Sequence, residues 1–226
     1  EYCSTNTEYF IENYIYIEHP DNKENILQRF KLWDKQKEVL QSIIDHRLNI
    51  ILKARQLGVT WLTLAYCLHC LLFNPGYLVI ALSKTEEDAK ELIRRLGTML
   101  SKLGMFIKED SKENENWQGL KYSTTALSIE INHKGKSSVF KAFSSSKSAG
   151  RSFTANLLVL DEWAFQQFAK EIWLSAYPTI NRPTGGKVIG LSTIDRGTLF
   201  EEIYTSDNDF NKIFMPWNSD PRRDMK

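Results

Sequence analysis

Two adjacent acids at the end of an apolar run are the residues of this 226-residue sequence best suited to chemistry. Residues 156–165 read NLLVLDEWAF, and the run ends in Asp161-Glu162. A continuous Leu/Val run predicts a strand buried in a parallel sheet, and such sheets bind ligands at the carboxyl ends of their strands. Asp161 could hold Mg²⁺ there, and Glu162 could orient and deprotonate a water molecule. A solvated strand end or a helix N-cap is the structural alternative.

A glycine loop far upstream could supply the matching phosphate site. Residues 48–60 (LNIILKARQLGVT) predict an apolar strand, a loop and the start of a helix. A P-loop has this layout, because its backbone N–H groups and a helix N-terminus surround a phosphate chain. The usual pattern, G-x-x-x-x-G-K-[ST], is kept at Gly58 and Thr60, but Lys53 replaces the first glycine and Val59 replaces the lysine. A strand, a glycine turn and a helix without a ligand is the alternative, and the acidic pair favours phosphate binding.

Each part of this loop has a predicted role. The amides that would surround the β- and γ-phosphates belong to Gln56, Leu57, Gly58, Val59 and Thr60. Glycine permits close backbone approach, and Thr60 would bind Mg²⁺ together with Asp161. Since the usual lysine is missing, the phosphates need another cation. Lys53 is the preferred residue, with Arg55 in support, and the choice between them stays open.

Four further residues are candidates for nucleotide chemistry. Arg151 lies in a loop of small residues, 144–152 (SSSKSAGRS), which suits an arginine finger or a plain surface turn. Gln36 precedes the glycine loop, and its amide could pair with both hydrogen-bonding edges of adenine or simply face solvent on a helix. Ser192 and Thr193 end the strand after the acidic one. They could sense the γ-phosphate or cap the next helix.

The predicted elements alternate along the chain. Helices are expected at residues 30–45, 60–73, 85–103, 168–177 and 199–204. Strands are expected at 49–52, 77–82, 126–131, 138–143, 157–160, 187–193 and 213–217. Strands alternating with helices predict an α/β fold, with a mostly parallel doubly wound sheet flanked by helices and one inserted β-hairpin.

Length and composition set the domain organisation. The chain fits one large domain at residues 30–217, after an N-terminal arm or helical extension at 1–29 and before a linker at 218–226. Net charge is only +1, so no global basic field indicates nucleic acid, although bases outnumber acids between residues 117 and 160. That segment could form a phosphate-binding face or a solvated hairpin. Cys67 and Cys70 are expected to be buried thiols, and the apolar runs are too short to span a membrane.

Four segments together resemble one family. KARQLGVT, LLVLDEWAF, the Gly-Arg before it and GLST resemble the large terminase subunit, the ATP-driven DNA-packaging motor of tailed bacteriophages, over about residues 30–217. The resemblance implies a P-loop ATPase domain in which Gln36 belongs to an adenine-binding motif. Asp161 and Glu162 would be the Walker B aspartate and the catalytic carboxylate, and Ser192-Thr193 the coupling motif. Arg151 resembles the arginine that some members insert into a neighbouring active site.

The resemblance also implies cofactors and partners. ATP and Mg²⁺ are the expected cofactors, and the function is translocation of double-stranded DNA into a procapsid by a homo-oligomeric ring. Portal protein and small terminase subunit are the other expected partners, in the host cytoplasm and without a membrane. The family's C-terminal nuclease domain has no counterpart here, so no DNA cleavage is expected. A helicase-type translocase and a hydrolysis-poor, ATP-binding DNA-docking module are the alternatives.

Overall fold

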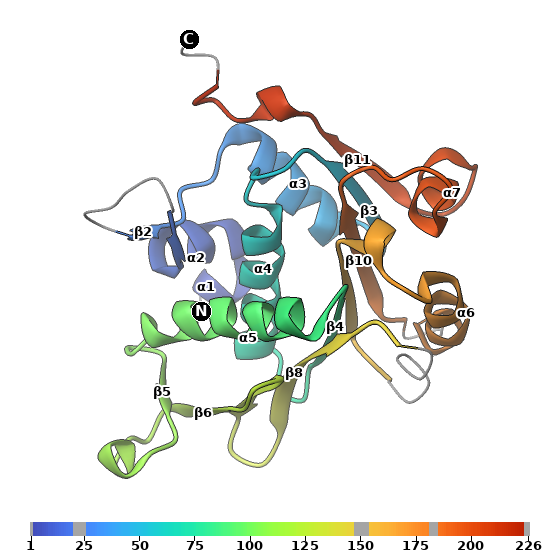
Figure 1. Cartoon of the computed structure of the whole chain (residues 1–226). Helices are drawn as coiled ribbons and strands as arrows, with labels where there is room; N and C mark the ends of the chain where they lie inside the picture. The colour runs from blue at the N-terminus through green and yellow to red at the C-terminus, as the bar shows by residue number, and fades with distance from the viewer. Residues whose placement is uncertain (1, 20–25, 147–153, 181–184, 224–226) are drawn as a thin grey trace.

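The computed structural model describes residues 2–19, 26–146, 154–180 and 185–223. Nine strands in these ranges are β3 (Leu48–Lys53), β4 (Leu78–Ser83), β5 (Ile107–Glu109), β6 (Leu120–Thr124), β7 (Ser128–Asn132), β8 (Ser137–Ser144), β9 (Leu157–Asp161), β10 (Lys187–Ser192) and β11 (Asn211–Met215). They form one sheet in the order β11-β3-β10-β9-β4-β8-β7-β6-β5 (Figure 1). Two further short strands, β1 (Tyr16–Glu18) and β2 (Leu27–Arg29), form an antiparallel ribbon.

The sheet is mostly parallel, as predicted. All neighbours from β11 to β8 pair in parallel, β7 is antiparallel to both its neighbours, and β5 is parallel to β6. The predicted hairpin is β7–β8, but β8 also pairs with β4 and so belongs to the central sheet. Strands β5 and β6 were not predicted. Both are short and largely polar, so no hydrophobic alternation marks them.

Helices cover both faces of this sheet (Figure 1). One face carries α1 (Tyr2–Thr5), α2 (Thr7–Tyr14), α3 (Asp34–Asp45), α4 (Val59–Phe73) and α5 (Glu86–Ser101). The other carries α6 (Ala169–Ile180) and α7 (Leu199–Thr205). Because side chains alternate along a strand, Ile51 of β3 packs in the first core and Ile50 in the second. Two layers of helices therefore enclose the central strands β3, β4, β9 and β10, which are buried on both faces.

Helix α4 lies at the centre of the larger core. Twelve of its fifteen residues are buried, and it contacts α2, α3 and α5 as well as the sheet. Cys67 and Cys70 are buried free thiols, as predicted. In the described ranges there are also three short 3₁₀ helices, η1 (Lys112–Asn114), η2 (Trp163–Phe165) and η3 (Trp217–Ser219). Burial on all sides fixes the axis of α4, and thereby its N-terminus, against the sheet.

The N-terminal segment packs on the same core. Phe10, Ile11 and Ile15 are fully buried there, and α2 contacts α4. His69 of α4 contacts Cys3 and Thr7 through its two ring nitrogens, at 2.9 Å to the Cys3 carbonyl oxygen and 3.4 Å to the Thr7 hydroxyl. Within the described ranges, no helix combines the length and apolar character needed to cross a membrane.

Candidate active site

Adjacent strand ends gather the predicted site residues at the carboxyl edge of the sheet. Strands β3, β10 and β9 are neighbours and run in parallel. Lys53 ends β3, Ser192 ends β10 and Asp161 ends β9. Helix α4 begins just after the loop that follows β3, so its N-terminal amides face this same edge. The sheet order therefore brings together segments that are far apart in the sequence.

An ion pair joins the glycine loop to the acidic strand. Lys53 Nζ lies 2.7 Å from Glu162 Oε1. The Lys53 side chain is only 8% exposed, against 35% for Glu162, so the pair spans the boundary between core and solvent. Arg55, in contrast, is exposed, and its backbone oxygen accepts a hydrogen bond from Arg223. Of the two candidate cations, Lys53 is the one in contact with the acidic pair.

The second link is a hydrogen bond from Thr60 to Asp161. Thr60 Oγ1 donates to Asp161 Oδ1 at 3.2 Å. Burial and the neighbouring Glu162 charge raise the pKa of Asp161 to about 6, although Lys53 and Thr60 act in the opposite direction. A bound divalent cation would favour the ionised carboxylate. A hydroxyl and a carboxylate side by side fit Mg²⁺, which commonly takes a few protein oxygens and completes its shell with phosphate oxygens and water.

The loop adopts a conformation that few residues allow. Gln56 and Gly58 both have positive φ, 64° and 71°. A Cβ on residue 58 would also lie 2.9 Å from Gln36 Nε2, so the positive φ and this close approach both favour glycine. Leu57 and Val59 are buried in the core beneath the loop. The usual pattern has a lysine at position 59. In this loop, the first carbons of a lysine there would occupy the buried position of Val59.

Gln36 connects the start of α3 to the loop. Its Oε1 accepts from the Trp33 backbone N–H at 3.0 Å, and its Nε2 donates to the Leu57 oxygen at 3.0 Å. The side chain is 2% exposed. Gln36 thus supports the loop in this structure. Its role in binding adenine stays a prediction.

Glu162 sits in a strained turn that Ser192 helps to hold. Its backbone is left-handed, with φ 48° and ψ 46°, which destabilises a non-glycine residue by roughly 1–2 kcal/mol. Ser192 is fully buried, and its Oγ accepts from the Ala164 N–H at 3.2 Å. Ser192 therefore contacts the turn that carries Glu162, and Thr193 follows directly, beyond the end of β10. Their predicted sensing role stays a prediction.

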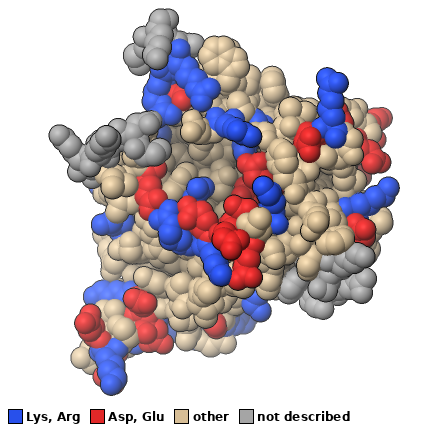
Figure 2. All heavy atoms as spheres, viewed as in Figure 1, with Lys and Arg blue, Asp and Glu red and all other residues tan. Residues whose placement is uncertain are grey.

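Charge around the site is mixed. On the face drawn in Figure 2, basic and acidic side chains are interspersed. In the segment predicted to be locally basic, Lys121 pairs with Asp110 at 3.5 Å. Arg151, the predicted arginine finger, lies outside the residues that the structure describes.

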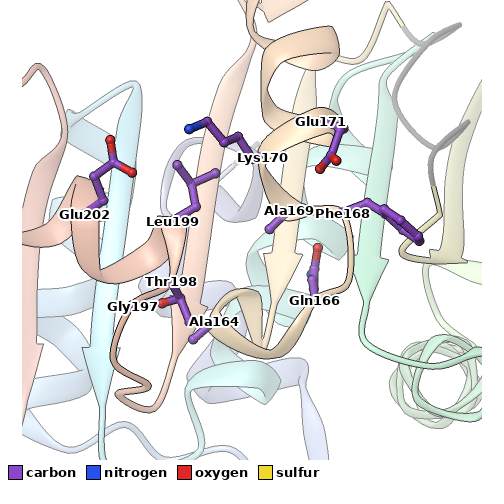
Figure 3. Close-up of a pocket in the computed structure, with 10 residues that line it drawn as sticks. All are labelled: Ala164, Gln166, Phe168, Ala169, Lys170, Glu171, Gly197, Thr198, Leu199 and Glu202. Atoms are coloured by element: carbon purple, nitrogen blue, oxygen red, sulfur yellow. The ribbon is translucent and has the colours of Figure 1, made fainter.

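One polar residue of this region was missed by the sequence analysis. Gln166 is 6% exposed, and its Nε2 donates to the oxygens of Leu82 and Asp161. Among the described residues its Oε1 has no hydrogen-bond partner. Gln166 also lines a cavity of about 340 Å³ between the η2 turn, the start of α6 and the loop before α7 (Figure 3). No feature of the sequence distinguishes Gln166 from its neighbour Gln167. In the structure Gln166 is buried, whereas Gln167 is exposed.

The sequence matches no protein family model. The structure, however, is similar to several solved ones. The ATPase domain of the large terminase of Thermus phage P74-26 superposes with a TM-score of 0.62 at 17% identity, covering 82% of this chain and 83% of that one. The HK97 bacteriophage large terminase gives 0.66 at 15% identity, covering 93% of this chain and 43% of that one. The fold is that of a phage large-terminase ATPase domain.

Two other similarities place this ATPase fold in a wider group. The large terminase of a thermophilic bacteriophage, solved in complex with ADP, gives a TM-score of 0.58 at 16% identity and covers 87% of this chain and 48% of that one. The chain thus spans less than half the length of this terminase and of the HK97 terminase. The UvsW helicase from bacteriophage T4 gives 0.56 at 13% identity, covering 94% of this chain and 67% of that one. Terminases and this helicase share the P-loop ATPase fold predicted from the sequence.

Proposed function

We propose that this chain is the ATPase domain of a phage large terminase, which hydrolyses ATP with Mg²⁺ to drive double-stranded DNA into a procapsid. The observation that carries the proposal is the cluster of Lys53, Thr60, Asp161 and Glu162 at the N-terminus of α4. All four lie where a phosphate chain would meet a helix N-terminus, in a fold shared with terminase ATPase domains.

Each residue has a defined part in the proposed reaction. The amides of the loop and Lys53 bind the phosphate chain, and Thr60 and Asp161 would hold Mg²⁺, which neutralises charge on the phosphate oxygens when bound. Glu162 accepts a proton from the attacking water as the water oxygen bonds to the γ-phosphorus. The bond from that phosphorus to the bridging oxygen breaks, and ADP leaves with the bond's electron pair.

The proposed ligands and partners follow from the terminase likeness. The large terminase of the thermophilic bacteriophage has been solved in complex with ADP and with ATP-γ-S, which supports nucleotide binding by this chain. Double-stranded DNA, the portal protein, the small terminase subunit and a homo-oligomeric ring on the procapsid are the partners we propose. The host cytoplasm is the proposed location.

The role of Glu162 gives the direct test. Glu162→Gln should bind ATP but lose ~10²–10⁴-fold in hydrolysis rate, because a general base contributes that much to catalysis. Phosphate release and nucleotide binding would be measured on the same protein. Glu130→Gln, which removes an exposed carboxylate on β7, is the control and should keep the wild-type rate. Turnover of Glu162→Gln at the wild-type level would exclude this carboxylate as the base.

A helicase-type translocase is the second candidate. The UvsW match covers nearly all of this chain and favours it. A strand-displacement assay distinguishes the two, because a helicase separates a duplex whereas a packaging motor moves along an intact one. The third possibility, a docking module that binds ATP without hydrolysing it, predicts no phosphate release from the wild-type protein.

A further inference from the structure

Gln166 joins the ends of two strands through one side-chain amide. Its Nε2 donates to the Leu82 oxygen in β4 and to the Asp161 oxygen in β9, both at 2.8 Å. The ladder between these strands has its last pair at Leu82 and Leu160. The Gln166 amide therefore continues the cross-link just beyond the point where direct pairing of β4 and β9 stops.

This contact acts on the backbone of Glu162. The Asp161 carbonyl belongs to the peptide unit that precedes Glu162, so a hydrogen bond to it restricts the rotation that sets the φ of Glu162. That φ is 48°, a left-handed value that a non-glycine residue keeps only when its surroundings hold it. Two further bonds hold the same turn: Phe165 N–H donates to the Glu162 oxygen at 2.9 Å, and Ala164 N–H donates to Ser192 Oγ.

Burial makes the Gln166 contact hard to replace. The side chain is 6% exposed, so water has little access to the two carbonyls if the amide is removed. Its neighbour Gln167 is exposed. Figure 3 shows Gln166 in the wall of the cavity, below the start of α6. The amide thus faces the strand ends from the side of the sheet opposite α4.

We propose that Gln166 is a positioning residue for the acidic pair: by holding the Asp161 carbonyl, it aims the Glu162 carboxylate at the water it activates. This inference rests on the proposed ATPase function. The two side-chain hydrogen bonds of Gln166 go to strand ends and not to the phosphate-binding loop, so its loss should lower turnover much more than it weakens nucleotide binding. Small errors in the placement of a catalytic group reduce reaction rates strongly, so loss of the Gln166 contact should slow ATP hydrolysis.

The test compares two neighbouring glutamines. Gln166→Met keeps the length and bulk of the side chain and removes both donors, and Gln167→Met makes the same change on the surface. In Gln166→Met, kcat for ATP hydrolysis should fall by roughly 10- to 100-fold. The KM for ATP and the Kd of a non-hydrolysable analogue should stay within about threefold of wild type. Gln167→Met should match wild type in all three.

A smaller change covers the case in which Gln166→Met fails to fold. Thermal unfolding would show this, and Gln166→Asn would then replace it, because it keeps a polar side chain whose amide is one methylene too short for the two contacts. For a folded variant, a fall in kcat below about threefold, or a rise in KM equal to the fall in kcat, overturns the proposal.

A measurement without nucleotide separates this proposal from the proposed function. Hydrogen exchange of the backbone amides of residues 162–166 should be faster in Gln166→Met and unchanged in Gln167→Met. If the wild-type protein hydrolyses no ATP, the ATPase proposal fails, and this exchange measurement still decides whether Gln166 holds the turn. Equal exchange in wild type and Gln166→Met overturns the positioning role.

Discussion

At the scale of single residues, the pairing of Lys53 with Glu162 is the contact with the clearest consequence. The cation at the start of the loop lies 2.7 Å from the candidate general base. A phosphate chain arriving at the loop would offer Lys53 a more highly charged partner than the single Glu162 carboxylate. Arg55 is exposed, and among the described residues no ion pair joins its side chain to the acidic pair.

The choice between the two cations is open to a direct test. Lys53→Ala should weaken ATP binding by roughly 10- to 100-fold, since a hydrogen bond to a charged group contributes about 1.5–3 kcal/mol. Arg55→Ala should change binding much less. Titration with a fluorescent nucleotide measures both. Normal affinity in Lys53→Ala with a loss in Arg55→Ala would transfer the role to the arginine.

At the scale of elements, α4 links the site to the N-terminal helices. Its first turn carries Thr60, and its third carries His69, whose ring contacts Cys3 and Thr7. His69 is buried against Phe10 and Phe73. Burial lowers the pKa of His69, while the Cys3 carbonyl acts in the opposite direction.

This histidine predicts a pH dependence of stability. Because the folded pKa lies below the unfolded one, folding favours neutral His69. The contribution of His69 to the free energy of unfolding is complete above its unfolded-state pKa of about 6.5. It is lost as pH falls below that value toward the lower pKa of the folded state. Wild type should therefore lose stability relative to His69→Gln as the buffer is acidified from neutral pH, as measured by denaturant unfolding. The exposed His46→Gln serves as the control and should follow wild type. Parallel curves for all three proteins would contradict the prediction.

At the scale of the whole molecule, the candidate site lies at the carboxyl edge of the central sheet, where β3, β10 and β9 end side by side. The residues that could bind phosphate come from β3 and α4 and, far from both in the sequence, from β9. Arg151 lies outside the described residues, so its predicted role rests on the sequence alone. An arginine supplied by a neighbouring subunit would make activity depend on assembly.

The proposed role of Arg151 predicts that specific ATPase activity depends on protein concentration. An arginine finger accelerates phosphoryl transfer by ~10³–10⁵-fold in other systems, so isolated monomers should bind ATP and hydrolyse it slowly. Specific activity should rise with protein concentration in wild type and not in Arg151→Ala, at nearly unchanged nucleotide affinity.

Mixing experiments test whether the arginine acts between subunits. Arg151→Ala and Glu162→Gln proteins should be inactive separately and partly active when mixed, because each supplies the group that the other lacks at a shared interface. If mixing restores nothing and the wild-type monomer is fully active, Arg151 acts within its own subunit or has a structural role.

Local features of the sequence were enough to predict most of the elements and to propose the candidate site residues. Gly58, Thr60 and the Asp161-Glu162 pair could be identified because a glycine turn, a helix start and an acid after a buried strand depend mainly on nearby residues. The buried strands β3, β4, β9 and β10 were found for the same reason, within one or two residues of their ends. The pairing of β5 with β6 was missed, because their polar residues carry no period.

Only the tertiary structure decided how these parts act on one another. The contact of Lys53 with Glu162 requires β3 and β9 to lie on either side of β10, which is a property of sheet order. Gln36 and Gln166 are polar residues that are buried in the fold. The Gln36 amide donates to the Leu57 oxygen, and the Gln166 amide donates to the Leu82 and Asp161 oxygens. No local pattern marks such residues, because their partners are chosen by long-range packing, which brings otherwise unpaired carbonyls within reach of a side chain.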